Sequence, residues 1–241
     1  YALNEENVIR FVKTGSGYEL RISNASWMKV NGEADHVKEQ VVALPDMTAY
    51  LDGQDKVYVS ARYFCIDANS LGTEVSYSMQ VAGAEVEEEW EQIDTGKLVN
   101  GWYPSQNGGW TGTAYSAMNT EAAGDFGVKF TGAGNLDYDA MIAQKKIPNG
   151  VGGVFATPQS LDGLDLRLTV NGDVPKTNVI MLSFSTTPTG LYHSQNDGSN
   201  GNGFYILFQQ NGDAYSSFFD TNIFAKNQTA HWAVPYGIRY A

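Results

Sequence analysis

The chain has 241 residues and a formal net charge of −12, and this length allows one large β domain or two small ones. Nucleic acid and anionic membrane surfaces are poor partners, because the phosphate contacts that dominate such binding would be repulsive. A single cysteine, Cys65, excludes an internal disulfide and a cysteine metal cluster, and no stretch reaches the apolar length of a membrane span.

The first third of the chain predicts short strands separated by turns. Residues 8–12 are followed by a Gly/Ser turn and then by residues 18–22, in which apolar and charged side chains alternate strictly. This alternation predicts a hairpin with one face in solvent. Further strands of the same kind are expected at residues 27–30, 56–62 and 74–79.

Residues 83–92 differ in character, because five glutamates crowd into a segment that neither alternates cleanly nor carries much apolar mass. Like charges at this density extend a chain, so the segment is interpreted as a linker or an exposed edge. An acidic Ca²⁺ cluster is the alternative, although ligands on an extended segment rarely converge on one ion. Asp137, Asp139 and Asp197 could also hold Ca²⁺, but their spacing matches no loop signature, and no other cofactor is expected.

Strand signals return in the rest of the chain. Continuous apolar runs at residues 179–182 and 204–208 are typical of strands covered on both faces, and the flanking Asn-Gly turns favour strand over helix. The strands expected here are residues 125–130, 164–170, 179–185, 204–209 and 214–219.

Several of these strands resemble a known family. Residues 161–170, 180–184 and 202–212 look like the first half of a concanavalin-like or laminin-G-like lectin sandwich, and residues 7–12, 18–22, 56–59 and 75–79 are similar to its second half. The resemblance implies an all-β, concanavalin-like jelly-roll β-sandwich that is permuted or completed by a neighbouring repeat. The expected organisation is a second half at 1–82, an acidic linker at 83–95 and a first half at 96–241. Two independent small β domains are the alternative.

The two ends of the sequence match each other. Tyr240-Ala241 repeats Tyr1-Ala2, and joining the ends gives an unbroken run into the strand at residues 8–12. This match favours a window cut from a tandem repeat protein, in which each half completes itself with the neighbouring copy. A circular permutant with adjacent ends and an ordinary chain with unrelated ends are the alternatives.

No catalytic motif stands out. The three histidines, His36, His193 and His231, are isolated, and none forms a pair at metal-binding spacing. The lectin sandwich also hosts glycosidases, which need paired carboxylates alternating on one strand. Residues 85–91 depart from that pattern, and residues 137–139 lack a third acid, so the chain is expected not to be an enzyme.

The best candidate for a ligand site is the loop at residues 191–203. As the resemblance implies, glycan sites lie in loops at the sandwich edge or on its concave face, where an aromatic ring stacks on a sugar and amides or carboxylates bind its hydroxyls. The loop offers Tyr192, His193, Asn196, Asp197, Asn200 and Asn202. A flexible surface loop is the alternative, because Gly and Asn also produce one.

The second candidate is residues 101–112, because two tryptophans and a tyrosine in a Gly-rich loop are hard to bury together. Trp102, Tyr103, Asn107 and Trp110 are the residues expected to contact a ligand, and a protein–protein contact explains them equally well.

These features favour a non-enzymatic, lectin-like module of an extracellular or cell-surface protein. Its expected partners are a glycan or neighbouring copies of itself. A purely structural repeat of an extracellular filament or adhesin stalk is the alternative from a different class.

Overall fold

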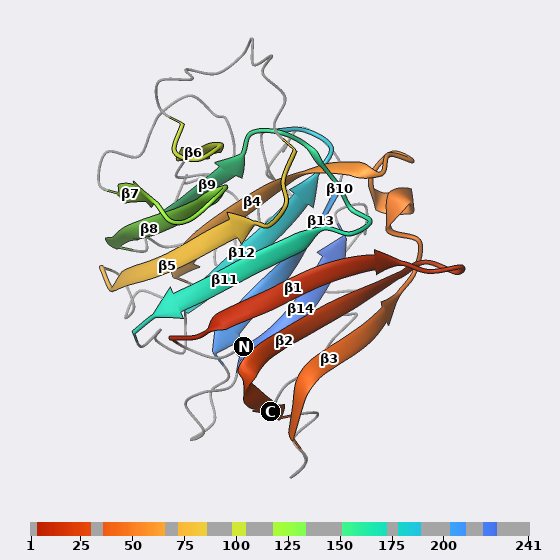
Figure 1. The fold of residues 1–241 in the computed structure, drawn as a ribbon, viewed down its shortest axis with the longest axis horizontal. Helices are drawn as coiled ribbons and strands as arrows, with labels where there is room; N and C mark the ends of the chain where they lie inside the picture. Colours follow the sequence, from red (N-terminus) through yellow and green to blue (C-terminus); the bar gives the residue numbers. More distant parts are fainter. Residues whose placement is uncertain are drawn as a thin grey trace, which may run out of the picture.

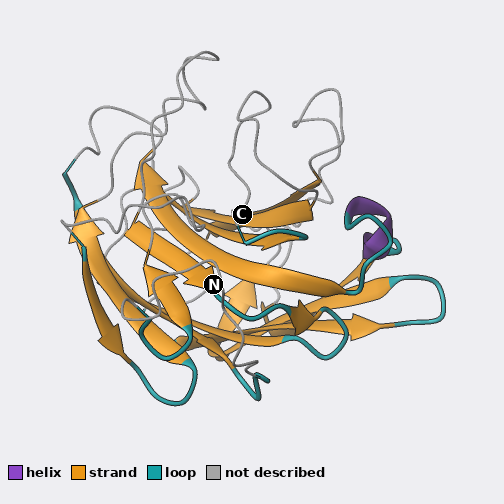
Figure 2. Ribbon diagram, turned by 90° about the horizontal axis from the view of Figure 1, so that it is seen from above, coloured by secondary structure: helices purple, strands orange, loops and turns teal. Residues whose placement is uncertain are grey.

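The fold is an all-β sandwich. The computed structural model describes residues 4–29, 36–65, 72–85, 98–104, 118–133, 151–172, 178–188, 203–210 and 219–225. Apart from the short 3-10 helix η1 (Met47–Tyr50), the regular elements of these residues are strands, and every strand pair is antiparallel. Two sheets form the two layers of the molecule (Figures 1 and 2). The expected all-β sandwich is confirmed.

The first sheet faces the viewer in Figure 1. Its strand order is β3-β2-β1-β11-β5-β8-β7. The strands are β1 (Glu6–Lys13), β2 (Tyr18–Lys29), β3 (His36–Leu44), β5 (Glu74–Val81), β7 (Asn119–Ala122), β8 (Gly127–Ala133) and β11 (Asp165–Asn171).

The second sheet lies behind the first. Its strand order is β14-β13-β12-β4-β9-β6, with β10 paired to the start of β4. The strands are β4 (Lys56–Cys65), β6 (Trp102–Pro104), β9 (Val151–Phe155), β10 (Gln159–Ser160), β12 (Asn178–Ser185), β13 (Gly203–Gln210) and β14 (Phe219–Ala225).

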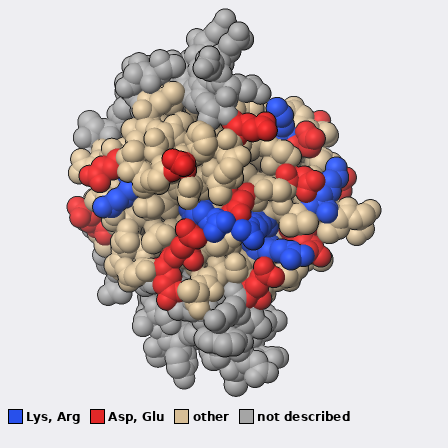
Figure 3. Space-filling model, in the orientation of Figure 1, with Lys and Arg blue, Asp and Glu red and all other residues tan. Residues whose placement is uncertain are grey.

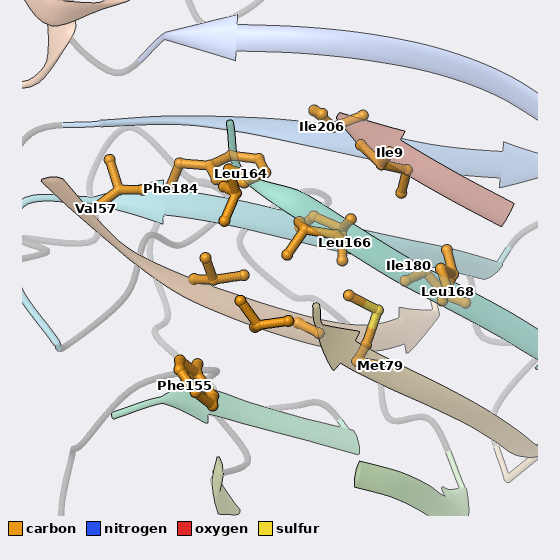
Figure 4. Packing of buried hydrophobic residues seen from close by; sticks show 14 of the residues in the cluster. Ile9, Val57, Met79, Phe155, Leu164, Leu166, Leu168, Ile180, Phe184 and Ile206 are labelled. Atoms are coloured by element: carbon orange, nitrogen blue, oxygen red, sulfur yellow. The ribbon is translucent and has the colours of Figure 1, made fainter. Parts of the chain in front are cut away.

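The core lies between the sheets and follows from the alternation in the sequence. On β5 and β11 every second side chain is buried, and the others are exposed or half-buried, because successive side chains of a strand point to opposite faces. Figure 4 shows Leu168 of β11 beside Ile180 of β12, and both belong with Leu166 to one continuous buried cluster between the sheets. Aromatic rings add to this packing: Phe184 stacks on Phe204 at 4.9 Å between centroids.

The second sheet is also buried on its outer face at its centre. Consecutive residues of β12 from Ile180 to Ser185 are all buried, which confirms that the apolar run at 179–182 is covered on both sides from Ile180 onward. On β4, Ser60 and Arg62 alternate with core residues and therefore point away from the core, yet each is only 2% exposed.

Strands distant in sequence lie side by side. β1 pairs with β11, from Glu6 opposite Thr169 to Arg10 opposite Asp165, and β4 lies between β12 and β9. The early and late parts of the chain therefore share both sheets, which contradicts the alternative of two independent small domains. The assignment of these parts to two halves of a lectin-like domain stays a prediction.

Two adjacent glycines let β9 approach its neighbours closely. A Cβ at Gly152 would lie 1.9 Å from the Ala61 carbonyl oxygen, and one at Gly153 would lie 2.4 Å from the Tyr103 carbonyl oxygen. Beside them, the Tyr77 hydroxyl donates to the Val151 carbonyl at 2.5 Å, which ties β5 of the first sheet to β9 of the second. These glycines thus let β9 lie close to β4 and β6 within the second sheet.

Some strand limits differ from the expected ones. The strand expected at residues 125–130 begins only at Gly127, because Phe126 has φ +53° and forms part of a turn. Of the strand expected at 27–30, residues 27–29 are the end of the long strand β2, and residue 30 lies outside the described residues. Of the strand expected at 214–219, only Phe219 lies within the described residues, as the first residue of β14.

Candidate functional site

Trp102 and Tyr103 of the second candidate loop are buried rather than available to a ligand. Trp102 is 0% exposed, its indole N–H donates to the Phe126 carbonyl at 3.0 Å, and its ring meets Phe155 edge-on. Tyr103 is 4% exposed. The Asn100-Gly101 turn leads both residues into strand β6, where they are buried. The sequence argument concerned these two residues together with Trp110, which lies outside the described residues.

The other predicted ligand residues lie outside the described part of the chain. They are Asn107, Trp110, Tyr192, His193, Asn196, Asp197, Asn200 and Asn202. The same holds for His231, for Asp137 and Asp139, and for residues 86–95 of the predicted acidic linker. These predictions stay predictions, but the strands that bracket the two candidate loops are described.

The described strand ends that flank the two candidate loops lie at opposite ends of the second sheet. β12 ends with Ser185 opposite Tyr58 near the start of β4, and β13 begins with Gly203 opposite Ser185. The loop at 191–203 is therefore rooted at the Lys56 end of β4. β6 runs the other way, because Pro104 lies opposite Gly153, which itself lies opposite Ala61. The strand ends that flank the two loops are therefore too far apart along the sheet to form one site.

The two broad faces of the sandwich differ in character among the described residues. The centre of the second sheet is buried on its outer face. The outer face of the first sheet carries ion pairs, in which Arg10 and Arg167 both bind Asp165 at 2.6 Å. Figure 3 shows acidic and basic side chains interspersed across this face, so its charges compensate one another.

A polar hollow of about 220 Å³ lies at one end of the sandwich, and we call it the end hollow. Its walls come from the end of β5 and the residues after it, from the surroundings of β10, from the start of β11 and the residues before it, and from the start of β4. The lining residues are Val81, Ala82, Gly83, Glu85, residues 158–160, residues 162–165 and Lys56. The hollow therefore spans both sheets. Because β10 pairs with Lys56 and Val57, it lies at the same end of β4 as the root of the loop at 191–203 (Figure 1).

The Gln159 side chain holds one wall of the end hollow in place. Its Oε1 accepts from the Glu85 backbone N–H at 3.2 Å, and its Nε2 donates to the Glu85 carbonyl at 2.9 Å. Gln159 is only 8% exposed, and its Nε2 also contacts the Thr157 carbonyl at 3.0 Å. The Gln159 amide group thus bonds both the N–H and the carbonyl of Glu85, as the backbone of a neighbouring strand would.

The opposite wall is fixed by backbone hydrogen bonds. The Gly163 N–H donates to the Phe11 carbonyl at 3.0 Å, and the Ala82 N–H donates to the Asp165 carbonyl at 2.9 Å. Gly83 and Gly163 have φ of +67° and +78°, which suits glycine, and a Cβ at either would meet nothing within 4 Å. The hollow is therefore preformed, with open space above both turns.

The charges of the end hollow fall into two groups. The Asp165 carboxylate is neutralised by Arg10 and Arg167. Asp162 uses Oδ1 to accept from the Lys13 backbone N–H at 2.9 Å. Asp162, Glu85 and Lys56 are exposed residues that line the hollow. The site thus offers hydrogen-bond donors and acceptors of both signs within a small space.

A buried tyrosine lies close to this end of the sandwich. Burial raises the pKa of Tyr18, and the nearby carboxylates of Asp46, Asp162 and Asp55 raise it further. The pKa of Asp46 is lowered, because the Thr48 hydroxyl and backbone N–H both donate to its carboxylate. The region around the hollow therefore favours a neutral Tyr18 and a charged Asp46.

Within the described ranges, no three His, Cys, Asp or Glu side chains come close enough together to hold one metal ion. The described part of the chain also contains no helix with the length and apolarity to span a membrane.

Sequence reasoning missed the end hollow because no single motif encodes it. Its residues come from separate segments, and Gln159 lies in a two-residue strand that no alternation announces. The only local signals are the glycine turns at Gly83 and Gly163. The chain matches no family model, no curated protein and no solved structure.

Proposed function

We propose that the protein is a non-enzymatic, lectin-like module that binds a glycan at the Lys56 end of the sandwich. The observation that carries the proposal is the position of the end hollow. A preformed polar hollow lies at the same end of β4 as the root of the Asn- and Gly-rich loop at 191–203.

This combination suits sugars physically. Sugar hydroxyls both donate and accept hydrogen bonds, so a site for them needs hydrogen-bond donors and acceptors close together. Glu85 and Asp162 line the hollow, and the sequence of the loop contains amides such as Asn196. The resemblance to lectin sandwiches supports the same class of ligand, and it also supports a location at the cell surface or outside the cell.

A glycan array probed with the purified chain tests the proposal. We expect binding to a subset of glycans, and we expect Asn196→Ala to reduce it if the loop takes part. Glu74→Gln is the matched control, because Glu74 is exposed at the far end of β5 from the hollow. A folded wild-type chain that binds no glycan on the array would contradict the proposal.

A structural repeat that assembles through its sheet edges is the second candidate function. β3 is an edge strand of the first sheet, and Val41 on it is 47% exposed, the one large hydrophobic side chain so exposed among the described residues. An edge with an exposed β-branched residue can add a strand from another chain.

The oligomeric state separates the two candidates. If edge pairing is the function, the chain forms concentration-dependent oligomers in analytical ultracentrifugation, and Val41→Lys abolishes them, since a charge on an edge strand opposes pairing. Ala43→Lys, at the next position along the same exposed side of β3, should have the same effect. A monomer at all concentrations would contradict this second function.

A further inference from the structure

We propose that the free edge of β3 pairs with β3 of a second copy of this chain, in an antiparallel arrangement about a two-fold axis that passes beside Val41. The inference rests on the second candidate function, assembly through sheet edges, and names the partner, the edge and the register. The first sheets of the two copies then form one continuous sheet across a closed dimer.

β3 is an edge that the described strands leave open. Among them it pairs with β2 alone, and Figure 1 shows it at the rim of the first sheet. Two other sheet edges are protected: β7 has four residues, of which three are exposed, and the three-residue β6 includes Pro104. Short strands and proline are common means of preventing edge pairing. β3 has nine residues and no proline, so it is better suited to pairing than these two edges.

Hydrogen bonds of β1 show which backbone groups of β3 point to the free edge. The Phe11 N–H donates to the Leu164 carbonyl at 3.0 Å, and the Phe11 carbonyl accepts from the Gly163 N–H at 3.0 Å, so both groups point away from β2. In an antiparallel ladder, hydrogen-bonded and non-hydrogen-bonded pairs alternate. Leu20 lies opposite Phe11 and therefore directs its backbone groups toward β3, where it lies opposite Val42. The backbone of Val42 thus bonds to β2, and the residues on either side of it point to the free edge.

The same alternation places the backbone N–H and C=O groups of Glu39, Val41 and Ala43 on the free edge. The register between β3 and β2 is regular from Glu39 to Leu44. The side chains of Glu39, Val41 and Ala43 are all exposed, and Val41 is 47% exposed. A second strand can therefore reach these backbone groups without displacing a buried side chain.

A two-fold axis beside Val41 is the register that uses all of these groups. Val41 then lies opposite Val41 of the second copy, and Glu39 lies opposite Ala43. An axis nearer the end of β3 brings Glu39 or Val41 opposite Pro45, which has no N–H to donate. An axis nearer the start of β3 moves Ala43 opposite Val37, beyond the irregularity in the pairing with β2, or sets the two Glu39 side chains opposite each other. Like charges directly opposite each other destabilise a sheet.

The charges and apolar groups also suit this register. No like charges face each other between the strands, and within each copy Arg21 lies 3.9 Å from Glu39. The exposed Val41 side chains of the two copies lie together, which removes apolar surface from water. Each copy carries a formal net charge of −12, so the association should strengthen as salt screens the long-range repulsion.

The unmodified chain tests the partner and the edge. At high ionic strength, sedimentation velocity at rising protein concentration should show a monomer that converts into a discrete dimer. Hydrogen exchange followed by NMR should slow about tenfold at the Val41 and Ala43 amides on dimerisation, the equivalent of one hydrogen bond. The Val42 amide, which points to β2, is the internal reference and should keep its rate.

These measurements separate the inference from the function on which it rests. A dimer in which the Val41 and Ala43 amides stay unprotected, or an open-ended series of larger oligomers, overturns the inference and leaves assembly through another edge as the second function. A chain that stays monomeric at all concentrations overturns both.

Disulfide cross-linking tests the register. In a Cys65→Ser background, Val41→Cys should give a covalent dimer on mild oxidation, because the Cα atoms of a hydrogen-bonded antiparallel pair lie about 5.5 Å apart, within the range that a disulfide spans. Glu39→Cys in the same background is the matched control. It is an exposed position of the same strand, but the proposed axis separates the two Glu39 positions by about 13 Å along the strands, so it should not cross-link. Any result other than preferential cross-linking of Val41→Cys overturns the register, and the exchange measurement on the unmodified chain remains independent of the Cys65→Ser background.

Discussion

Gly152 is one of the described glycines at which the fold has no room for a side chain. A Cβ there would lie 1.9 Å from the Ala61 carbonyl oxygen and 2.8 Å from the Tyr77 hydroxyl. The nearest atom belongs to the backbone of β4 and cannot move without disturbing the sheet. We expect Gly152→Ala to lower the free energy of unfolding by about 3 kcal/mol, the upper part of the usual range for overpacking.

Chemical denaturation measures this effect through the midpoint of the transition. Gly15→Ala is the matched control, because Gly15 lies in an exposed turn, where an added Cβ would have nothing within 4 Å. Its stability should change by no more than about 0.5 kcal/mol. Equal effects of the two substitutions would show that β9 does not approach β4 as closely as described.

The buried Tyr77 makes the stability of the fold depend on pH in the alkaline range. Burial raises its pKa well above the ordinary value of 10.0, and the charge of Arg62 opposes this only partly. The folded state therefore holds the phenol proton more tightly than the unfolded chain does. The resulting stability is fully present below pH ~10, where unfolded tyrosine begins to ionise, and is lost as the pH rises from there toward the folded pKa.

We expect Tyr77→Phe to reduce this alkaline loss in denaturation curves recorded across neutral and alkaline pH. At neutral pH the same substitution should cost about 1 kcal/mol, because the Val151 carbonyl loses its hydrogen bond. Tyr18→Phe provides the comparison. The Tyr18 hydroxyl is buried without a hydrogen bond to the described residues, so its removal should leave neutral stability unchanged or raise it.

Two hydrogen bonds between the Gln159 side chain and the Glu85 backbone join β10 to the chain that follows β5, and we call this pair the Gln159 clamp. Gln159→Ala removes the acceptor of the Glu85 N–H and the donor to the Glu85 carbonyl. We expect hydrogen exchange at the Glu85 amide to accelerate about tenfold, the equivalent of one lost hydrogen bond. The Ala82 amide, bonded to the Asp165 carbonyl, is the internal reference and should keep its rate. Parallel acceleration at both amides would mean that the end of β5 opens as a unit and that the clamp is not local.

The alternation of side chains predicted the strands but not their partners. Residues 18–22 and 164–170 largely coincide with parts of β2 and β11, because one face of each is buried and period-2 alternation is the direct consequence. The sequence did not predict β9 (Val-Gly-Gly-Val-Phe), because the strand contains two glycines and glycine is depleted in strands. The glycines occur there because of tertiary packing. A Cβ at Gly152 would clash with the backbone of β4, and one at Gly153 would clash with the backbone of β6.

The candidate site was less predictable than the strands. Trp102 was expected to contact a ligand because of its Gly-rich neighbours, whereas its burial depends on Phe126, Phe130 and Phe155 from two other segments. The end hollow likewise needs segments that meet only in the folded chain. A sequence pattern reports which face of an element is apolar, but it does not report which distant element covers that face.

At the scale of the whole molecule, the fold depends on strand pairs between the early and late parts of the chain. If the chain is divided within residues 86–97, the fragment 1–85 keeps the pairs β1·β2 and β2·β3 but loses the pairs of β1 and β5 with β11 and those of β4 with β9 and β12. Its fully buried residues Val57, Val59 and Tyr63 would then face water, at a cost of about 1.5–3 kcal/mol for each large apolar side chain.

We therefore expect neither fragment 1–85 nor fragment 98–241 to unfold cooperatively alone, as measured by circular dichroism during heating. Mixed in equal amounts, the two should associate and recover one cooperative transition, because the missing sheet neighbours and the shared core are restored together. Gly152→Ala in the larger fragment should weaken this association, since β9 then cannot lie against β4, whereas Gly15→Ala in the smaller fragment should not. A cooperative transition in fragment 1–85 alone would contradict the shared core, because that fragment would then possess a hydrophobic interior of its own.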